Sequence, residues 1–411
     1  MKESDPTMNP TGNRPGIDDH SIVIFGAGRI GRSFIGQLFG RSGYRLVFID
    51  ADPVLVGRLN AAGCYRVIMK GEKEEEIVVS NLEAIHAADT VHAAGAVSSA
   101  GILAVSVGMN AIEKVVPSVA AGIDLRHRLN PRAPLDIILA ENMRSAAGFV
   151  RDGLRKHLPP DFPVDTYTGL IETSIGKMVP IMPVSELEKD PLLIFAEPYN
   201  TLILDAAAFK NPVPGVAGLA PVNNIRAWVD RKAFIHNLGH ATAAYFGNYL
   251  FPEAVYMHEV LDHQEVRKFT REVMLQSADI IKATYPDEFT LQDLVDHTDD
   301  LILRFRNKAL GDTIFRVGRD LPRKLAADDR FMGAVHLAAR FGMPCDKIIK
   351  AMSFGFFFSA KDEAGNSYQP DIDFRKAVQE NPGTAMLNIL GLDLPGDSAV
   401  IKQLKEYLAA G

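Results

Sequence analysis

A glycine-rich turn between two apolar segments is the feature of this chain that most restricts its fold. "SIVIFGAG" predicts a buried strand that ends in a tight turn, and "RIGRSFIGQLFGRSG" predicts the helix that follows. A second apolar strand, "RLVFID", comes directly afterwards. A strand, a glycine turn, a helix and another strand in this order indicate a βαβ unit of a parallel sheet.

The glycines of this turn have the spacing of a dinucleotide-binding site. Gly26, Gly28 and Gly31 form the pattern G-x-G-x-x-G. The first glycine permits the turn, the second lets the backbone approach a pyrophosphate, and the third lets helix and strand pack closely. The backbone of Arg29 and Ile30, at the start of the helix, is expected to bind the phosphates. The same spacing also occurs in turns that serve packing alone.

Other cofactor contacts are expected where further parallel strands end. Asp50 ends "RLVFID", where a carboxylate would bind the adenosine ribose and repel a 2′-phosphate, which favours NAD over NADP. The alternative role for Asp50 is to cap the turn before Pro53. Gly108 ends "GILAVSVG" and Asn142 ends "LDIILAEN". Both are expected near the cofactor, and Asn142 would also serve as a helix N-cap.

Strand and helix patterns alternate up to about residue 205, with "VDTYTGLIETSI" and "PLLIFAEPYNTLILD" as the last predicted strands. The Pro- and Gly-rich "NPVPGVAGLAPV" follows, and beyond it the pattern is helical. The predicted fold class is therefore α/β: a Rossmann-like, doubly wound, mostly parallel sheet and a mostly α-helical C-terminal domain. The predicted segments are a flexible tail (1–20), the NAD-binding domain (21–205) and the helical substrate domain (206–411). Helices of the second half are expected near 224–250, 254–284, 290–308, 324–341, 344–356, 371–380 and 398–410.

Composition excludes several functions. A net charge of −7 argues against nucleic-acid or anionic-membrane partners, and no apolar run is long enough to span a bilayer. Two cysteines are too few for a disulfide framework and favour the cytoplasm. The cysteines lie far apart and no His-Glu-x-x-His spacing occurs, which disfavours zinc-dependent chemistry, and no metal is expected.

The stretch "RKAFIHNLGHATAAYFGNYL" carries the candidate catalytic groups. If the stretch is an α-helix, Lys232, Asn237 and His240 fall on one broad face, with His236 between them. A lysine whose pKa is lowered by burial and nearby positive charge can accept a hydroxyl proton, and an asparagine amide can stabilise the developing oxyanion. The plain alternative is a solvated lysine beside a buried, hydrogen-bonded asparagine and histidine.

Several segments together resemble the polyol-specific long-chain dehydrogenases, most closely their mannitol-1-phosphate 5-dehydrogenase branch. They are "FGAGRIGRSFIG", "AENM", "RKAFIHNLGHATAAYFG" and "RFRNKALGDTIFRVGRDLPRKLAADDR". The resemblance implies a metal-independent mechanism with Lys232 as general base, Asn237 and Asn142 as oxyanion donors and His240 as a binder of substrate hydroxyls. It also implies a monomer or a small homo-oligomer. The chain departs from the family pattern at Gly176, Lys177 and Lys308, which leaves the substrate open.

A basic segment, "RVGRDLPRKLAADDR", favours a phosphorylated substrate, because arginine forks suit phosphate oxygens. The predicted substrate contacts are His236, Arg316, Arg319, Arg323 and Lys324. The alternative is that these cations pair with neighbouring aspartates on a solvated face. Mannitol 1-phosphate and fructose 6-phosphate are the expected pair. A free polyol or hexuronate, or a non-catalytic NAD-binding sensor, are the competing hypotheses.

Overall fold

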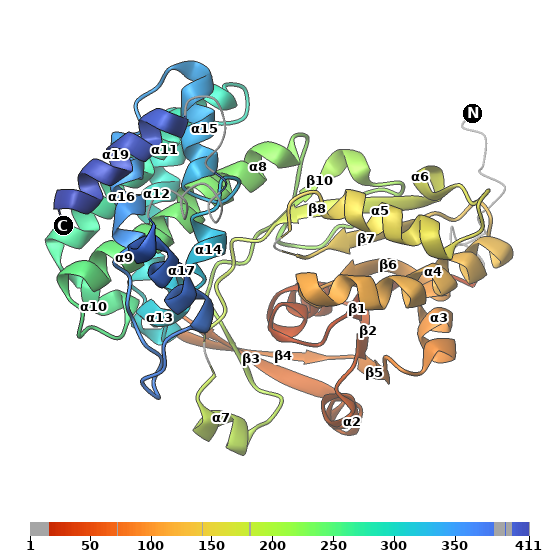
Figure 1. Ribbon diagram of the computed structural model, residues 1–411. Coiled ribbons are helices and arrows are strands. Elements are labelled where there is room, and N and C mark those ends of the chain that lie inside the picture. Colours follow the sequence, from red (N-terminus) through yellow and green to blue (C-terminus); the bar gives the residue numbers. More distant parts are fainter. Residues whose placement is uncertain are drawn as a thin grey trace. The chain divides into compact units, whose positions relative to one another are not determined.

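The computed structural model describes residues 16–71, 73–141, 143–180, 182–381, 391 and 397–410. The chain divides into two compact units, Met1–Ile225 and Arg226–Gly411 (Figure 1). The predicted division after residue 205 falls earlier, because the segment that follows adds one more strand to the sheet of the first unit. Residues 1–15 of the predicted tail lie outside the described residues, and the first strand begins at Asp18.

An eight-stranded sheet forms the centre of the first unit. Its strands, in spatial order, are β11 (Leu219–Val222), β10 (Leu202–Asp205), β8 (Thr168–Ser174), β7 (Leu135–Leu139), β6 (Ala100–Val105), β1 (Asp18–Phe25), β2 (Arg45–Asp50) and β5 (Leu82–His86). All neighbouring pairs are parallel except β8 and β10. The order from β5 to β8 is the 3-2-1-4-5-6 order of dinucleotide-binding sheets. The predicted Rossmann-like, mostly parallel sheet is confirmed.

Alternate residues of the strands face two separate cores. Ile22 and Ile24 pack with the helices that follow β1 and β2, whereas Val23 and Phe25 pack against α3, α4 and α5 on the other face (Figure 1). Both faces are therefore covered, as the predicted doubly wound arrangement requires. The helices of this unit are η1 (Gly31–Gly36), α1 (Gln37–Arg41), α2 (Pro53–Ala62), α3 (Thr90–Ser99), η2 (Met109–Ala111), α4 (Ile112–Leu129), α5 (Ala146–His157), α6 (Val164–Tyr167), α7 (Val184–Lys189) and η3 (Ala206–Ala208).

A second, three-stranded sheet was not predicted. It consists of β4 (Glu74–Ser80), β3 (Cys64–Lys70) and β9 (Ile194–Ala196), with β3 antiparallel to β4 and parallel to β9. Residues of β3 alternate between buried and half-buried, so its period-2 pattern was readable. The predicted strand "PLLIFAEPYNTLILD" is wrong as a single element: β9 and β10 belong to different sheets and Pro198 lies between them.

The described part of the second unit is helical, as predicted. Its elements are α8 (Ile225–Arg231), η4 (Lys232–Asn237), α9 (Leu238–Leu250), α10 (Met257–Asp262), α11 (Gln264–Thr284), α12 (Leu291–Phe305), η5 (Lys308–Leu310), α13 (Ile314–Gly318), α14 (Leu321–Lys324), α15 (Met332–Phe341), α16 (Asp346–Gly355), α17 (Gln369–Glu380) and α19 (Asp397–Ala410). Helix α9 is mostly apolar and mostly buried, in contact with α10, α11, α13 and α16. In the described part of the chain, no helix combines the length and apolarity needed to cross a membrane.

The predicted helix 324–341 is wrong in its first part. Helix α14 ends at Lys324 and α15 begins at Met332. Between them the Asp329 carboxylate accepts a hydrogen bond from the N–H of Arg330 and also contacts the Arg330 and Arg323 side chains. Aspartate side chains compete in this way with helical backbone bonds, which explains the break.

Arg126 of α4 joins the α3–β6 junction to the loop that precedes β7. Its fully buried guanidinium donates to the carbonyls of Ser98, Ala100, Ala133 and Pro134 at 2.7–3.3 Å. We expect Arg126→Gln to lower the free energy of unfolding by about 3 kcal/mol or more, because several buried carbonyls lose their donor. Urea unfolding measures this change.

The matched control is Arg128→Gln on the same helix. Arg128 is exposed and pairs with Asp124 one turn earlier, so its loss should cost no more than about 0.5 kcal/mol. Equal effects of the two substitutions would contradict the role assigned to Arg126.

Candidate active site

The three glycines of the turn after β1 are needed for two different reasons. Gly26 has φ of +93°, and a Cβ there would lie 2.5 Å from the Ser106 carbonyl oxygen. A Cβ on Gly31 would lie 1.9 Å from the Gly26 carbonyl oxygen. Gly28 is exposed, and its Cβ would meet no atom within 4 Å. The first and third glycines are thus required by packing, and the second leaves open space in which a ligand can approach the backbone.

Asp50 is positioned at this turn by two backbone bonds. Its Oδ2 accepts from the N–H of Ala27 at 2.7 Å, and its Oδ1 accepts from the N–H of Asp52 at 2.9 Å. A carboxylate has about four acceptor positions, so lone pairs remain for ribose hydroxyls. The alternative role is also present, because the bond from the Asp52 N–H lets Asp50 cap the turn before Pro53. Asp52 in turn caps the start of α2 by accepting from Val54 and Leu55. The open Gly28 and the fixed Asp50 fit a dinucleotide.

Gly108 follows β6 and is bonded to Glu141, the residue that precedes Asn142. Its N–H donates to Oε1 of Glu141 at 2.8 Å, and Gly108 has φ of +86°. Glu141 is buried, and burial raises the pKa of its carboxyl group. Asn142 itself lies outside the described residues. Glu141 was not singled out from the sequence, although the "AEN" segment contains it.

The lysine and the asparagine lie on a π-helix rather than on the expected α-helix. Element η4 runs from Lys232 to Asn237, and α9 continues from Leu238. In a π-helix the backbone bonds join residues five apart, so Lys232 and Asn237 lie one turn apart on the same side. His240 follows three residues later in α9, again about one turn on. The three side chains are therefore aligned more closely than an α-helix would allow.

His236 and His240 are held against one ring of α12. His240 stacks on Phe305 with centroids 4.4 Å apart and planes 5° apart, and His236 lies 5.4 Å from the same ring. The two imidazoles are 6.3 Å apart. Burial, followed by nearby cations, lowers the pKa of both well below the ordinary value, so both are neutral at pH 7. A neutral imidazole offers one donor and one acceptor, which suits hydroxyl groups.

The basic segment divides into two groups. The charges of Arg316 and Lys324 act on His240, and Nε2 of His240 is 3.6 Å from Asp312, the ion-pair partner of Arg316. Arg323 is exposed and paired with Asp320 and Asp329. Arg319 is also exposed, and it lies over the rings of Phe315 and Tyr368. Two predicted substrate contacts are thus near His240, and two lie on the surface.

Two cations near this cluster were not among the predicted site residues, although one of them, Arg330, ends the basic segment. Arg304 lowers the pKa of both histidines, and Arg330 lowers that of His240 and of Lys232. Nη1 of Arg330 also donates to the Asn237 carbonyl oxygen at 3.3 Å, at the end of the π-helix. Both arginines occur in the long segment "RFRNKALGDTIFRVGRDLPRKLAADDR", but nothing local in that segment shows which side chains turn inward.

The general base expected from the sequence has the electrostatics that this role requires. Burial and, as the smaller cause, the positive charge of Arg330 together lower the pKa of Lys232 from its ordinary value to about 8. An amine with this pKa is partly neutral near physiological pH, and a neutral amine can accept a proton.

The departures from the family pattern also have defined surroundings. The buried Lys177 donates to Oδ1 of Asn200 at 2.9 Å and lies over the Phe34 ring. A Cβ on Gly176 would be 3.5 Å from the Tyr199 ring. Lys308, the third departure, is the first residue of the short helix η5, which Asn307 caps by accepting from the Ala309 N–H.

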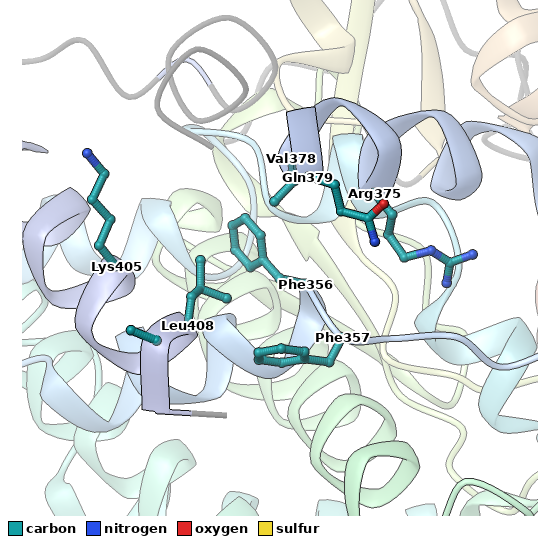
Figure 2. Close-up of a pocket in the computed structure, with 8 residues that line it drawn as sticks. Phe356, Phe357, Arg375, Val378, Gln379, Lys405 and Leu408 are labelled. Carbon is teal, nitrogen blue, oxygen red and sulfur yellow. The ribbon is translucent and has the colours of Figure 1, made fainter. Parts of the chain in front are cut away.

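Other sites within the described residues are weaker candidates. A cavity of about 360 Å³ lies between α17 and α19. Phe356, Phe357, Arg375 and Lys405 line it, but Figure 2 shows the two cations extending in opposite directions. No group of three or more His, Cys, Asp or Glu residues in the described ranges could hold a metal ion.

A Rossmann-type unit with an open glycine turn, followed by a helical unit with a lysine of lowered pKa, defines a two-domain protein of the dehydrogenase class. The model of the mannitol dehydrogenase Rossmann domain matches residues 20–218, and that of the mannitol dehydrogenase C-terminal domain matches residues 224–410. The chain belongs to the mannitol dehydrogenase family. The resemblance seen in the sequence is confirmed at this level.

Two solved structures share the fold. D-sorbitol dehydrogenase in a substrate-free form has a TM-score of 0.78 and 16% identity, covering 96% of this chain and 93% of that chain. Mannitol 2-dehydrogenase of Pseudomonas fluorescens, in a ternary complex with NAD and D-mannitol, has a TM-score of 0.70 and 14% identity, covering 95% and 91%. The likeness therefore extends over nearly the whole length of both proteins.

The lowered pKa of Lys232 can be tested without any substrate. The rate at which acetic anhydride acylates Lys232, followed by peptide mass spectrometry, should rise with pH through a midpoint near 8. Arg330→Met should move this midpoint upward, toward the ordinary lysine value, because a nearby positive charge is lost.

Arg323→Met is the matched control, because Arg323 shares the partner Asp329 but does not act on Lys232. An unchanged midpoint in Arg330→Met, or equal shifts in the two variants, would contradict the electrostatic role of Arg330.

Proposed function

We propose that this protein is an NAD-dependent polyol dehydrogenase that interconverts a secondary alcohol and a ketone without a metal. The observation that carries the proposal is that Lys232 and Asn237 lie one turn apart on the π-helix, with His240 about one turn later in α9 and the pKa of Lys232 lowered to about 8. Family membership and the glycine turn with Asp50 support NAD as the redox partner.

The proposed chemistry assigns one task to each side chain. Neutral Lys232 accepts the proton of the substrate hydroxyl as the hydride leaves the same carbon. The Asn237 amide, and Asn142 by its expected role, donate hydrogen bonds to the oxygen as it becomes a carbonyl. His236 and His240 bind neighbouring hydroxyls of the polyol. Bound NAD⁺ supplies the hydride acceptor, and reduction runs through the same groups in reverse.

For the substrate we propose mannitol 1-phosphate, with fructose 6-phosphate as the product. Cations exceed carboxylates around His240: Arg304, Arg316, Lys324 and Arg330 all lower its pKa. A substrate phosphate would offset this positive potential, and Arg316 and Lys324 are the candidate contacts. Arg319 and Arg323 contribute less to this argument, because both are exposed.

A free polyol is the second candidate substrate. Arg316 already pairs with Asp312, and Lys324 donates to the Val317 carbonyl, so these cations have partners without a phosphate. The two solved structures of the same fold are named for the unphosphorylated polyols sorbitol and mannitol. A hexuronate would meet the same cations with its carboxylate.

The substrate proposal is tested by NADH oxidation with fructose 6-phosphate, fructose, fructuronate and tagaturonate. We expect turnover with the phosphate. Burial lowers the pKa of Lys324, a bound phosphate would favour its protonated form, and Lys324→Gln should therefore raise the KM of the phosphate about tenfold or more. Arg323→Gln, an exposed cation of the same segment, is the control and should change KM little.

Each other outcome of this assay has a definite meaning. Turnover with fructose or a uronate alone would replace the substrate and keep the mechanism. The sensor hypothesis requires that NADH binds without turnover of any of these compounds. If the protein is an enzyme, Lys232→Met should lose kcat severely and still bind NADH.

The two directions of the reaction should depend on pH in opposite ways. Oxidation of the alcohol needs neutral Lys232, so its kcat/KM should rise as pH increases through about 8. Reduction of the ketone needs protonated Lys232, so its kcat/KM should fall over the same interval. Initial rates between pH 6 and 10 test this expectation, and parallel profiles in the two directions would exclude Lys232 as the acid–base group.

A further inference from the structure

A buried arginine lies directly beneath the glycine turn. Arg32 follows Gly31, and its side chain is buried. Its Nε donates to the Ala27 carbonyl oxygen at 2.7 Å, and its Nη1 donates to the Leu192 carbonyl oxygen at 2.6 Å. The Tyr65 hydroxyl donates to the backbone carbonyl of Arg32 at 2.8 Å. The guanidinium thus joins the turn to the segment that leads into β9.

The bond from Arg32 determines how the turn presents its backbone. The peptide that joins Ala27 to Gly28 is planar and trans, so its N–H points opposite to its carbonyl. Because the carbonyl points to the buried guanidinium, the N–H of Gly28 points away from it. Gly28 is exposed, and a Cβ there would meet no atom within 4 Å. The N–H of Gly28 is therefore directed to the side where a ligand can approach.

The charge of Arg32 reinforces this geometry. Within the described residues no carboxylate forms an ion pair with Arg32, and the two acidic residues whose charges act on it, Asp50 and Asp190, are bonded to other groups. Burial lowers the pKa of Arg32, but an arginine stays protonated at pH 7. A positive charge beneath the start of a helix adds to the helix dipole, which also attracts anions.

We propose that Arg32 is a positioning residue for the pyrophosphate of the dinucleotide: it turns the Gly28 N–H outward and supplies a buried positive charge behind it. This inference rests on the dinucleotide site of the proposed function. It assigns to Arg32 an effect on the diphosphate part of the ligand and little effect on the adenosine part, which the Asp50 carboxylate contacts.

The test compares ligands with and without the diphosphate. Dissociation constants of NAD⁺, ADP and adenosine are measured by calorimetry for the wild type and for Arg32→Gln. We expect the constants of NAD⁺ and ADP to rise about ten- to one-hundredfold, because an anion loses a charged partner and an oriented donor. The constant of adenosine should change by less than about threefold.

Two control variants distinguish a specific loss of diphosphate binding from a general loss of stability. Tyr65→Phe removes a buried bond to the Arg32 backbone and leaves the guanidinium in place, and Arg126→Gln removes a buried arginine elsewhere in the same unit. Both should lower thermal stability without changing the ratio of ADP to adenosine affinity. If Arg32→Gln does not fold, Arg32→Lys carries the test, because it keeps the charge but lacks the fork that reaches both carbonyls.

Other results would overturn the inference. Unchanged ADP binding in Arg32→Gln, or equal losses for ADP and adenosine, would reduce Arg32 to a structural residue. A wild-type protein that binds neither NAD⁺ nor ADP would instead refute the proposed cofactor. These measurements need only binding. A wild-type protein that binds NAD⁺ but has no activity would contradict the proposed enzyme function and would still allow the role of Arg32 to be tested.

Discussion

The approach of Gly31 to the Gly26 carbonyl is the contact on which the first unit depends. A Cβ at Gly31 would overlap that oxygen, so only glycine lets the helix begin directly against the turn. This close packing brings Arg32 under the Ala27 carbonyl and leaves the Ala27 N–H for Asp50. One backbone contact therefore sets the positions of the turn, the buried cation and the carboxylate together.

Both candidate sites use a π-helical segment. Element η1 begins at Gly31, and η4 contains Lys232 and Asn237. Such segments are less stable than α-helix and are frequent at functional sites. In η4 the extra residue per turn aligns a lysine and an asparagine five positions apart, while most residues of the neighbouring α9 are buried. The π-helical turn is thus continued by a well-packed helix, as a pre-organised site requires.

The electrostatics of the second unit follow from burial more than from the number of charges. The chain is acidic overall, yet around His240 the cations exceed the carboxylates. Desolvation, with a smaller contribution from nearby cations, keeps His236 and His240 neutral and lowers the pKa of Lys232 to about 8. Cations of the same segment that stay exposed, such as Arg323, are instead neutralised by aspartates on the surface. Neighbouring cations on one short helix therefore have different surroundings: Lys324 is buried, whereas Arg323 is exposed and paired with aspartates.

The sequence alone determined the βαβ start, the requirement for glycine in the turn, the two-part organisation and the residue types that carry the chemistry. These features depend on local periodicity and on spacing along the chain. Tertiary structure decided the rest: the small sheet in which β3 pairs with the distant β9, the division after Ile225, and the break between Lys324 and Met332. It also decided the π-helix at Lys232 and which cations turn inward. The physical reason is that strand pairing, desolvation and helix register are set by contacts between residues far apart in sequence, which no local pattern records.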